Sequence, residues 1–445
     1  MRSQHDLTTG NITSGLWAFA VPLMLGNVLQ QLYNLADTWV VGKCIGNNAL
    51  AAVGASYTLM IFLTSVIIGL CLGSSAFIAM AYGKKNTEKI KNGIFLSFAF
   101  TALITVLLIV LFCAGLDTII KWLRVPQETV SDMRIYLFYV FMGFFATFIY
   151  NYISNLLRGL GNSVVPLFFL ALSVVLNIAL DILFVAGFQM GIAGAAQATV
   201  LAQHISGFGL LIYYWIKYPG LRLHKKDCVW NREDFMEILL LSGFTCLQQS
   251  VMTFGILMVQ GLVNSFGAVV MAAFAVAVKI DTIAYMPVQD FGNAFSTYVA
   301  QNYGAGQSER IRKGIRSAGL TSALFCIFIS VMVCLFASPL MGIFIDVSQV
   351  DIIAAGVHYL RIEGACYIGI GILFLLYGYY RAVNQPGMSV VLTIASLGTR
   401  VALAYLLSAT PLGVTGIWLS VPIGWALADA IGIGYYLVRY KKVTQ

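Results

Sequence analysis

The segment Tyr82–Ile94, YGKKNTEKIKNGI, returns in the second half of the chain as Tyr303–Ile315, YGAGQSERIRKGI. The two copies share Tyr, Gly, Glu, Ile, Gly and Ile, and most other positions are conservative replacements. Three more pairs match at nearly the same offset: 45–54 with 266–275, 158–161 with 381–384, and 190–194 with 412–416. Matches that keep one order over most of the chain indicate an internal duplication.

The composition is that of a membrane protein. Of the 445 residues, 60% are hydrophobic and 10% are charged, against about 25% charged in soluble domains. This excludes a disordered chain, a disulfide scaffold and a nucleic-acid-binding domain. Twelve apolar stretches reach the roughly 20 residues that cross a bilayer. They are 15–42, 53–80, 94–115, 135–157, 164–187, 191–216, 236–265, 272–302, 317–344, 355–380, 388–409 and 413–437.

The duplication and the spans together predict the architecture. We expect an all-α polytopic membrane protein whose twelve transmembrane helices form two six-helix lobes, 1–216 and 236–445, joined by a cytoplasmic linker, 217–235. Six is an even number, so both halves cross the membrane in the same sense and the repeat is parallel, with a central cavity between the lobes. This arrangement favours a transporter. A channel more often surrounds its pore with several subunits, and a membrane enzyme needs no such symmetry.

Basic residues fall in alternate connections, which indicates the orientation. The clusters are Lys84, Lys85, Lys89 and Lys91; Lys217, Arg222, Lys225, Lys226 and Arg232; Arg310, Arg312, Lys313 and Arg316; and Arg439, Lys441 and Lys442. With twelve spans they all lie on one side, so the positive-inside rule predicts that both termini are cytoplasmic. Most of the net charge of +8 therefore reflects topology. The segment 1–14 lacks the apolar core of a cleaved signal peptide, and the scattered cysteines suggest neither disulfides nor a metal site.

The order and spacing of several motifs resembles the multidrug and toxic compound extrusion (MATE) family. The motifs are Pro22 and QQLYNLADT (30–38) in the first span, the repeated Tyr-Gly loops, RGLG (158–161) with Pro166, and Asn177 four residues before Asp181. The resemblance implies a secondary antiporter of the bacterial drug-exporter branch rather than an enzyme. It also implies a monomer in the bacterial inner membrane, small organic cations and membrane lipid as partners, no nucleic acid, and no cofactor beyond a coupling H⁺ or Na⁺.

Polar residues inside the first half indicate where such a cation binds. Asn27, Gln30, Asn34 and Asp37 recur at three- or four-residue spacing, which places them on one face of a helix. Each charge near the bilayer centre costs roughly 2.5–3.5 kcal/mol, so it needs a partner, a proton or water. Carboxylate, amide and hydroxyl oxygens suit a proton or Na⁺ and suit Zn²⁺ poorly. A polar bundle core with no transport role is the alternative.

The resemblance assigns roles to individual residues. Asp37, Asn177, Asp181 and Thr199 are implied to form the cation-coupling site, and would be the metal ligands if the coupling ion is Na⁺. Gln31, Tyr33 and Asn34 are candidates for the substrate cavity, and Pro22 is the candidate hinge.

The second half lacks a copy of this site. The duplication aligns Met258, Arg400 and Ala404 with Asp37, Asn177 and Asp181. The second half instead contains Lys279, Asp281, Asp290, Arg361, Glu363 and Arg400, which we expect to form internal ion pairs. Proton transfer or substrate contact is the alternative use of these charges.

Two rival functions remain. One is a lipid or lipid-linked oligosaccharide flippase of the same superfamily, which would need a strongly cationic cavity. The other is a polytopic membrane enzyme, but no loop offers a metal-ligand cluster, a nucleophile elbow or a phosphate-binding loop.

Overall fold

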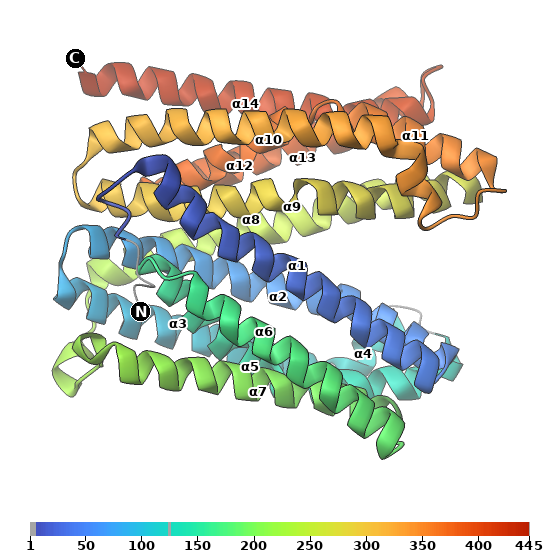
Figure 1. The fold of residues 1–445 in the computed structure, drawn as a ribbon, viewed down its shortest axis with the longest axis horizontal. Coiled ribbons are helices and arrows are strands. Elements are labelled where there is room, and N and C mark those ends of the chain that lie inside the picture. Colours follow the sequence, from blue (N-terminus) through green and yellow to red (C-terminus); the bar gives the residue numbers. More distant parts are fainter. Residues whose placement is uncertain (1–5, 123–125, 445) are drawn as a thin grey trace. The chain divides into compact units, whose positions relative to one another are not determined.

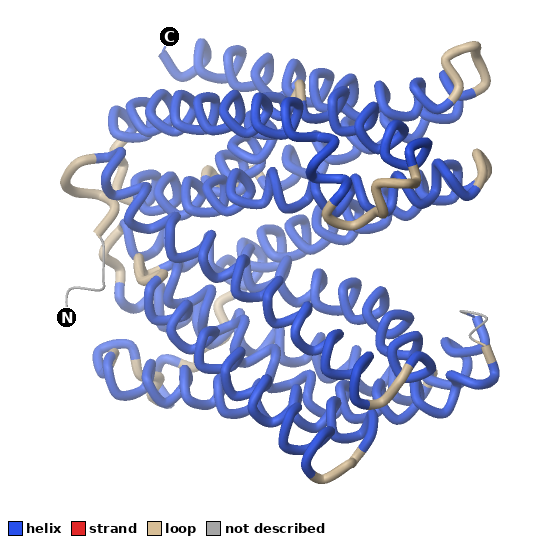
Figure 2. The backbone as a smooth tube through the Cα atoms, turned by 45° about the vertical axis from the view of Figure 1, so that its right-hand side comes forward, coloured by secondary structure: helices blue, strands red, loops and turns tan. Residues whose placement is uncertain are grey.

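The computed structural model describes residues 6–122 and 126–444, which fold into helices joined by short loops (Figure 1 and Figure 2). The helices of the first half are α1 (Ile12–Cys44), α2 (Asn47–Gly83), α3 (Thr87–Ala114), α4 (Leu116–Trp122), α5 (Gln127–Gly159), α6 (Val164–Asp181), the π-helix η1 (Ile182–Gly187) and α7 (Gly191–Lys217). Two short 3₁₀ turns follow, η2 (Pro219–Leu221) and η3 (Lys225–Asp227). The helices of the second half are α8 (Arg232–Asn264), α9 (Ala268–Gly304), α10 (Ser308–Gly342), α11 (Val350–Gly364), α12 (Tyr367–Ala382), α13 (Pro386–Ser408) and α14 (Val414–Thr444).

The helices confirm the prediction of an all-α multi-span membrane protein. Among the described residues, eleven helical segments are long and apolar enough to cross a bilayer, with α6 and η1 counted as one. The pair α11 and α12 brings the number to twelve if it counts as one span. The span predicted over 355–380 falls on this pair, which is bent: α11 and α12 meet at an angle of 52°. At this bend the Cys366 amide donates to the carbonyl of Glu363 and the Gly369 amide to that of Cys366, each at 2.9 Å. These tighter three-residue bonds end one helix and start the next.

The duplication reappears in the order and bounds of the helices. α2 ends at Gly83 and its counterpart α9 ends at Gly304, which are matching positions of the repeated segment. The bent pair α11 and α12 spans 350–382 and corresponds to the unbroken α5, which spans 127–159. The short helix α4 was not predicted, because a helix of two turns carries too little periodicity to stand out from a loop.

The compact units of the structure divide the chain differently from the predicted lobes. Unit 1 consists of Met1–Asp6 with Val21–Cys246, and unit 2 consists of Leu7–Ala20 with Leu247–Gln445. Relative to the lobes 1–216 and 236–445, the start of α1 belongs to unit 2, while the predicted linker and the start of α8 belong to unit 1. The linker itself is shorter than predicted, because α8 already begins at Arg232.

Each unit has its own apolar core. In unit 1, α5 packs against α2 and α7 and contributes a series of buried aromatic rings: Phe141, Phe144, Phe148 and Tyr152. In unit 2, the Phe274 ring stacks on Trp418 at 5.4 Å, and Tyr359 meets Trp418 edge-on at 4.9 Å. Rigid rings of this size fill the space between helices and fix their spacing.

Candidate functional site in unit 1

Three helices of unit 1 bring together the residues to which the coupling role was assigned. Asp37 comes from α1, Asn177 and Asp181 come from α6, and Thr199 comes from α7. Asp37 is 7% exposed, Asn177 0% and Asp181 1%, although all three belong to strongly apolar spans. Asn177 and Asp181 are four residues apart, so they occupy the same face of α6.

The Thr199 hydroxyl links these helices by hydrogen bonds. Its Oγ1 accepts a hydrogen bond from the Tyr33 hydroxyl and another from the Asn177 amide Nδ2, both at 3.3 Å. Tyr33 belongs to α1 and Asn177 to α6, so one side chain of α7 ties both helices together. Tyr33 was predicted as a cavity residue, and in this structure its hydroxyl is hydrogen-bonded within the same cluster as Thr199 and Asn177.

Four oxygens of the cluster are buried without a hydrogen-bond partner among the described residues. They are Oδ1 of Asp37, Oδ1 of Asn177 and both carboxylate oxygens of Asp181. The two carboxylates are close enough to interact electrostatically with each other. Buried acceptors are nearly always satisfied in folded proteins, so four in one place need an explanation. A proton or a small hard cation would satisfy them.

Helix α6 changes form immediately after Asp181. The segment Ile182–Gly187 forms a π-helix, in which the Phe188 amide donates to the carbonyl of Leu183, five residues back, at 2.8 Å. Single π turns inside helices are uncommon and occur frequently at functional sites. Nothing in the sequence predicts this turn.

Tyr136 is a member of the cluster that the sequence did not reveal. It is buried on α5 and interacts electrostatically with Asp37, Asp181 and Tyr33. It belongs to a span rich in Phe and Tyr, where one more aromatic residue gives no signal of a polar role. The repeat offers a weak hint, because Tyr359 of the second half falls at the matching place.

The remaining predicted residues also belong to α1. Gln31 is exposed, and Asn34 is half-buried and donates from Nδ2 to the Tyr57 hydroxyl at 3.5 Å. Pro22 lies inside α1, directly after the Ala20–Val21 junction at which the helix passes from unit 2 to unit 1.

The charges of the second half gather only in part. Asp281 of α9, Glu363 of α11 and Arg400 of α13 interact electrostatically, and the two acidic residues are only 5% and 1% exposed. Lys279 and Arg361, by contrast, are exposed. The described contacts therefore bring together three of the six predicted charges, as a cluster of two carboxyl groups and one guanidinium.

A duplicated twelve-span architecture with a buried acid pair is typical of secondary transporters. The sequence model of the MatE family matches residues 22–183 and 243–406, one segment in each half. The chain belongs to the MATE family, and it is a multi-pass membrane transporter rather than an enzyme.

Individual relatives agree with this membership. "Probable multidrug resistance protein YpnP" of Bacillus subtilis is 33% identical over 98% of this chain and 97% of its own length. The "FAD transporter" of Shewanella oneidensis is 22% identical over 99% of this chain and 97% of its own length. A solved outward-facing multidrug resistance MATE family transporter has a TM-score of 0.92 at 23% identity and covers 100% of this chain and 99% of its own.

Proposed function

We propose that this protein exports amphipathic, mostly cationic organic compounds in exchange for H⁺ or Na⁺ by alternating access. The observation that carries the coupling part is the group of four buried oxygens on Asp37, Asn177 and Asp181 that have no hydrogen-bond partner in the part of the chain that the structure describes. Leaving two carboxylates ionised and unpartnered at this depth would cost several kcal/mol. A site of this kind therefore favours a bound proton or cation. Releasing that cation leaves the carboxylates ionised again, so binding of the organic cation must offset this cost.

The export of drugs is supported by relatives. YpnP of Bacillus subtilis and a protein of Thermotoga maritima, which is 28% identical over 92% of this chain, are both named as probable multidrug resistance proteins. Basic connections in the sequence support insertion in a bacterial inner membrane with both termini in the cytoplasm. Membrane lipid would then surround the helices, and no cofactor other than the coupling ion is needed.

Helix α1 is the element through which the cation acts. Pro22 has no amide hydrogen, so the carbonyl four residues earlier lacks its normal helical donor and the helix bends more easily there. Neutralising Asp37 removes the need to keep its carboxylate close to the other polar groups. We propose that this change bends α1 at Pro22 and alters the substrate cavity near Gln31, Tyr33 and Asn34.

The energetics limit the stoichiometry. Export against a hundredfold gradient costs about 2.7 kcal/mol. One charge moving through 100 mV supplies about 2.3 kcal/mol. Exchange of one H⁺ for one monovalent cation moves no net charge, so the membrane potential then contributes nothing. Two carboxylates in one site allow two inward cations per drug molecule, which recovers that contribution.

Dye efflux from proteoliposomes tests the proposed function. Purified protein is reconstituted, ethidium is loaded, and an inward gradient of H⁺ or of Na⁺ is imposed separately. We expect efflux with at least one of the two gradients and none in protein-free liposomes. Absence of efflux under both gradients would contradict the export of organic cations.

An anionic substrate is the second candidate, because one relative is named an FAD transporter. A lipid-linked pyrophosphate or a dinucleotide would require free cationic groups. Arg400 interacts electrostatically with Asp281 and Glu363, and Lys279 and Arg361 are exposed; these three are the candidates. The same proteoliposomes, loaded with FAD instead of ethidium, compare the two substrate classes directly.

Replacing Thr199 tests the hydrogen-bonded cluster. Thr199→Val keeps the side-chain shape but removes the acceptor for Tyr33 and Asn177. Losing a buried hydrogen bond costs about 1–3 kcal/mol, so we expect gradient-driven efflux to fall about tenfold or more. Thr199→Ser keeps the hydroxyl and should retain most of the activity. Equal efflux rates for the Val and Ser variants would exclude a role for this hydroxyl.

A further inference from the structure

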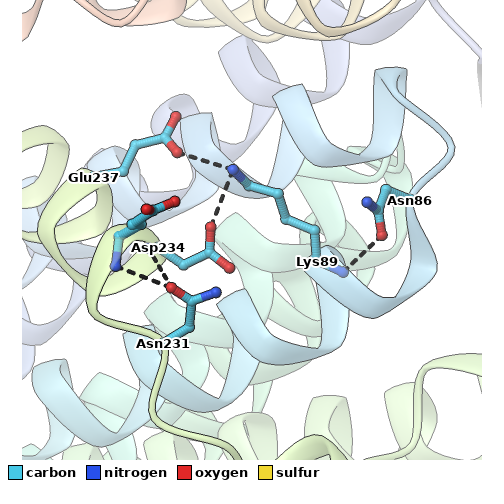
Figure 3. Close-up of polar contacts among 6 residues, drawn as sticks. Asn86, Lys89, Asn231, Asp234 and Glu237 are labelled. Atoms are coloured by element: carbon cyan, nitrogen blue, oxygen red, sulfur yellow. Dashed lines mark hydrogen bonds and ion pairs between the residues drawn. The ribbon is translucent and has the colours of Figure 1, made fainter.

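Lys89, within the first copy of the repeated segment, holds the start of α8 in unit 1. Its ammonium lies 3.1 Å from the Asp234 carboxylate and 3.0 Å from that of Glu237, one turn apart on α8 (Figure 3). Asn231 caps the same helix, because its Oδ1 accepts from the amides of Glu233 and Asp234 at 2.9 and 3.2 Å. These contacts join the first turn of α3 to the first two turns of α8.

The loop before α8 is attached to α3 as well. Lys91 lies 3.4 Å from the Asp227 carboxylate, and Asn92 Nδ2 donates to the Val229 carbonyl at 2.6 Å. The backbone amide of His224 donates to the Asp227 carboxylate and, together with Lys91, lowers the pKa of Asp227.

Arg310 occupies the position of Lys89 in the second copy, and in unit 2 it holds the segment just before α1, which begins at Ile12. Its guanidinium donates to the three carbonyls of Leu7, Thr9 and Gly10, at 3.0 to 3.2 Å. Asn302 supports this contact: its Oδ1 accepts from Arg310 Nε at 3.2 Å, and its Nδ2 donates to the Leu7 carbonyl at 3.1 Å.

The residues next to the contact are also equivalent in the two copies. An aromatic ring lies against the glycine of the repeated segment: Phe77 against Gly93 in unit 1, and Tyr298 against Gly314 in unit 2. A Cβ added at either glycine would lie 2.5 or 2.3 Å from the ring. The ring is also next to the basic residue, because Lys89 Nζ lies 4.9 Å from the Phe77 centroid and the Tyr298 hydroxyl donates to the Arg310 carbonyl at 2.7 Å.

The two helices held in this way leave the unit that holds them. α1 starts in unit 2 and continues in unit 1 from Val21, and α8 starts in unit 1 and continues in unit 2 from Leu247. α1 carries Asp37 further along. In each unit, a basic residue of the repeated segment therefore contacts the beginning of a helix, or the segment just before it, and the remainder of that helix belongs to the other unit.

We propose that Lys89 and Arg310 are positioning residues. Throughout the transport cycle, Lys89 keeps the first turns of α8 attached to unit 1, and Arg310 keeps the segment that leads into α1 attached to unit 2. Movement of either unit is then passed along α1 and α8 into the other, and Arg310 acts on the coupling cluster through α1. The inference rests on the proposed export function. It assigns the two repeated segments a shared role in holding helices. The positive-inside rule alone does not explain that role, because it accounts only for the number of basic residues on one side of the membrane.

Neutral variants of the two basic residues provide the first test. Arg310→Gln and Lys89→Gln should each slow ethidium efflux about tenfold or more, because the four hydrogen bonds of Arg310 or the two ion-pair contacts of Lys89 are lost. Their ethidium affinity, measured by fluorescence on purified protein, should remain within about twofold of wild type, since the cluster in unit 1 is intact. Lys89→Arg, which keeps the positive charge, should retain efflux. The matched controls Lys84→Gln and Arg316→Gln, both at exposed positions, should leave efflux unchanged.

Disulfide rescue separates positioning from folding. The hydroxyls of Thr13 in α1 and Ser317 in α10 lie 2.7 Å apart, and those of Ser74 in α2 and Ser242 in α8 lie 3.0 Å apart. Cysteine pairs at these positions, in a cysteine-free background with confirmed efflux, are within reach of a disulfide. Oxidation of the 13–317 pair should restore efflux to Arg310→Gln, the 74–242 pair should do so for Lys89→Gln, and reductant should reverse both.

Two results would overturn the inference. One is wild-type efflux in both neutral variants. The other is loss of efflux when either disulfide forms in the background with Lys89 and Arg310 intact, because the helix start would then have to detach during transport. Failure of the export function itself is distinct, since it abolishes efflux by the wild-type protein.

Discussion

Asp37→Asn is expected to reduce gradient-driven ethidium efflux to the level of protein-free liposomes while the protein stays folded. The carboxamide has nearly the same shape as the carboxylate but can neither take up a proton nor attract Na⁺ with a full charge. Asp37 is 7% exposed within an apolar span, and one of its oxygens has no hydrogen-bond partner among the described residues. Removing a buried charge of this kind relieves a cost of roughly 2.5–3.5 kcal/mol, so stability should not fall.

The measurement pairs efflux rates with thermal unfolding of the purified variant. Asp117→Asn is the matched control, because Asp117 of α4 makes an exposed ion pair with Arg134. The control should export at the wild-type rate. Wild-type efflux by Asp37→Asn would remove Asp37 from the coupling site, whereas a large loss of thermal stability would assign it a structural role.

Gly73→Ala is expected to cause the largest loss of stability. Helices α2 and α8 approach so closely in unit 1 that a Cβ at Gly73 would lie 2.4 Å from Ser242 Cα and 2.5 Å from the Leu241 carbonyl oxygen. These are backbone atoms, so the helices must separate, which also breaks the hydrogen bond between Ser74 and Ser242. Overpacking of this kind costs about 1–3 kcal/mol or more. Gly69, one turn earlier, makes a similar approach to Cys246, as in other membrane helix pairs with small residues four apart.

A glycine on the same helix gives the opposite expectation. Gly54 has nothing within 4 Å of an added Cβ. Gly54→Ala should therefore raise the stability of α2 by about 0.5–1 kcal/mol, because alanine loses less backbone entropy in a helix. Thermal unfolding in detergent should show a lower midpoint for Gly73→Ala and an unchanged or higher one for Gly54→Ala. Equal midpoints would contradict the close packing of α2 on α8.

Much of the fold follows from hydropathy. All twelve predicted spans correspond to helices or to the bent pair, because each span must bury or face lipid with an apolar surface for its whole length. The helices extend beyond the apolar stretches where polar turns continue them, as at the start of α5. The bend between α11 and α12 was not predicted, because its one local signal is Gly364, and glycine is common inside transmembrane helices.

The site was predicted where polar residues interrupt an apolar pattern. Asp37, Asn177 and Asp181 stand out for that reason, and the family resemblance supplied their grouping with Thr199. Tyr136 did not stand out, because a tyrosine among phenylalanines leaves the pattern unchanged.

The sequence also did not predict that α1 and α8 each begin in one unit and continue in the other. Arg310 binds backbone carbonyls, which every residue possesses, so nothing in the sequence marks Leu7–Gly10 as its partner. Lys89 binds two carboxylates of α8, which are far from it in the chain and follow no spacing rule that links them to α3. The sequence revealed the duplication of these segments, and the structure shows what each copy holds.

The dependence of ethidium binding on H⁺ and Na⁺ tests the central claim most directly, namely that the buried oxygens of Asp37 and Asp181 exchange a cation for substrate. Ethidium affinity is measured by fluorescence on purified protein in lipid nanodiscs, over a range of pH and of Na⁺ concentration. Wild-type protein should bind ethidium more weakly as the concentration of the coupling cation rises. The ethidium affinity of Asp37→Asn and of Asp181→Asn should not change with the concentration of either cation. The same cation dependence in the wild type and in both variants would contradict the claim.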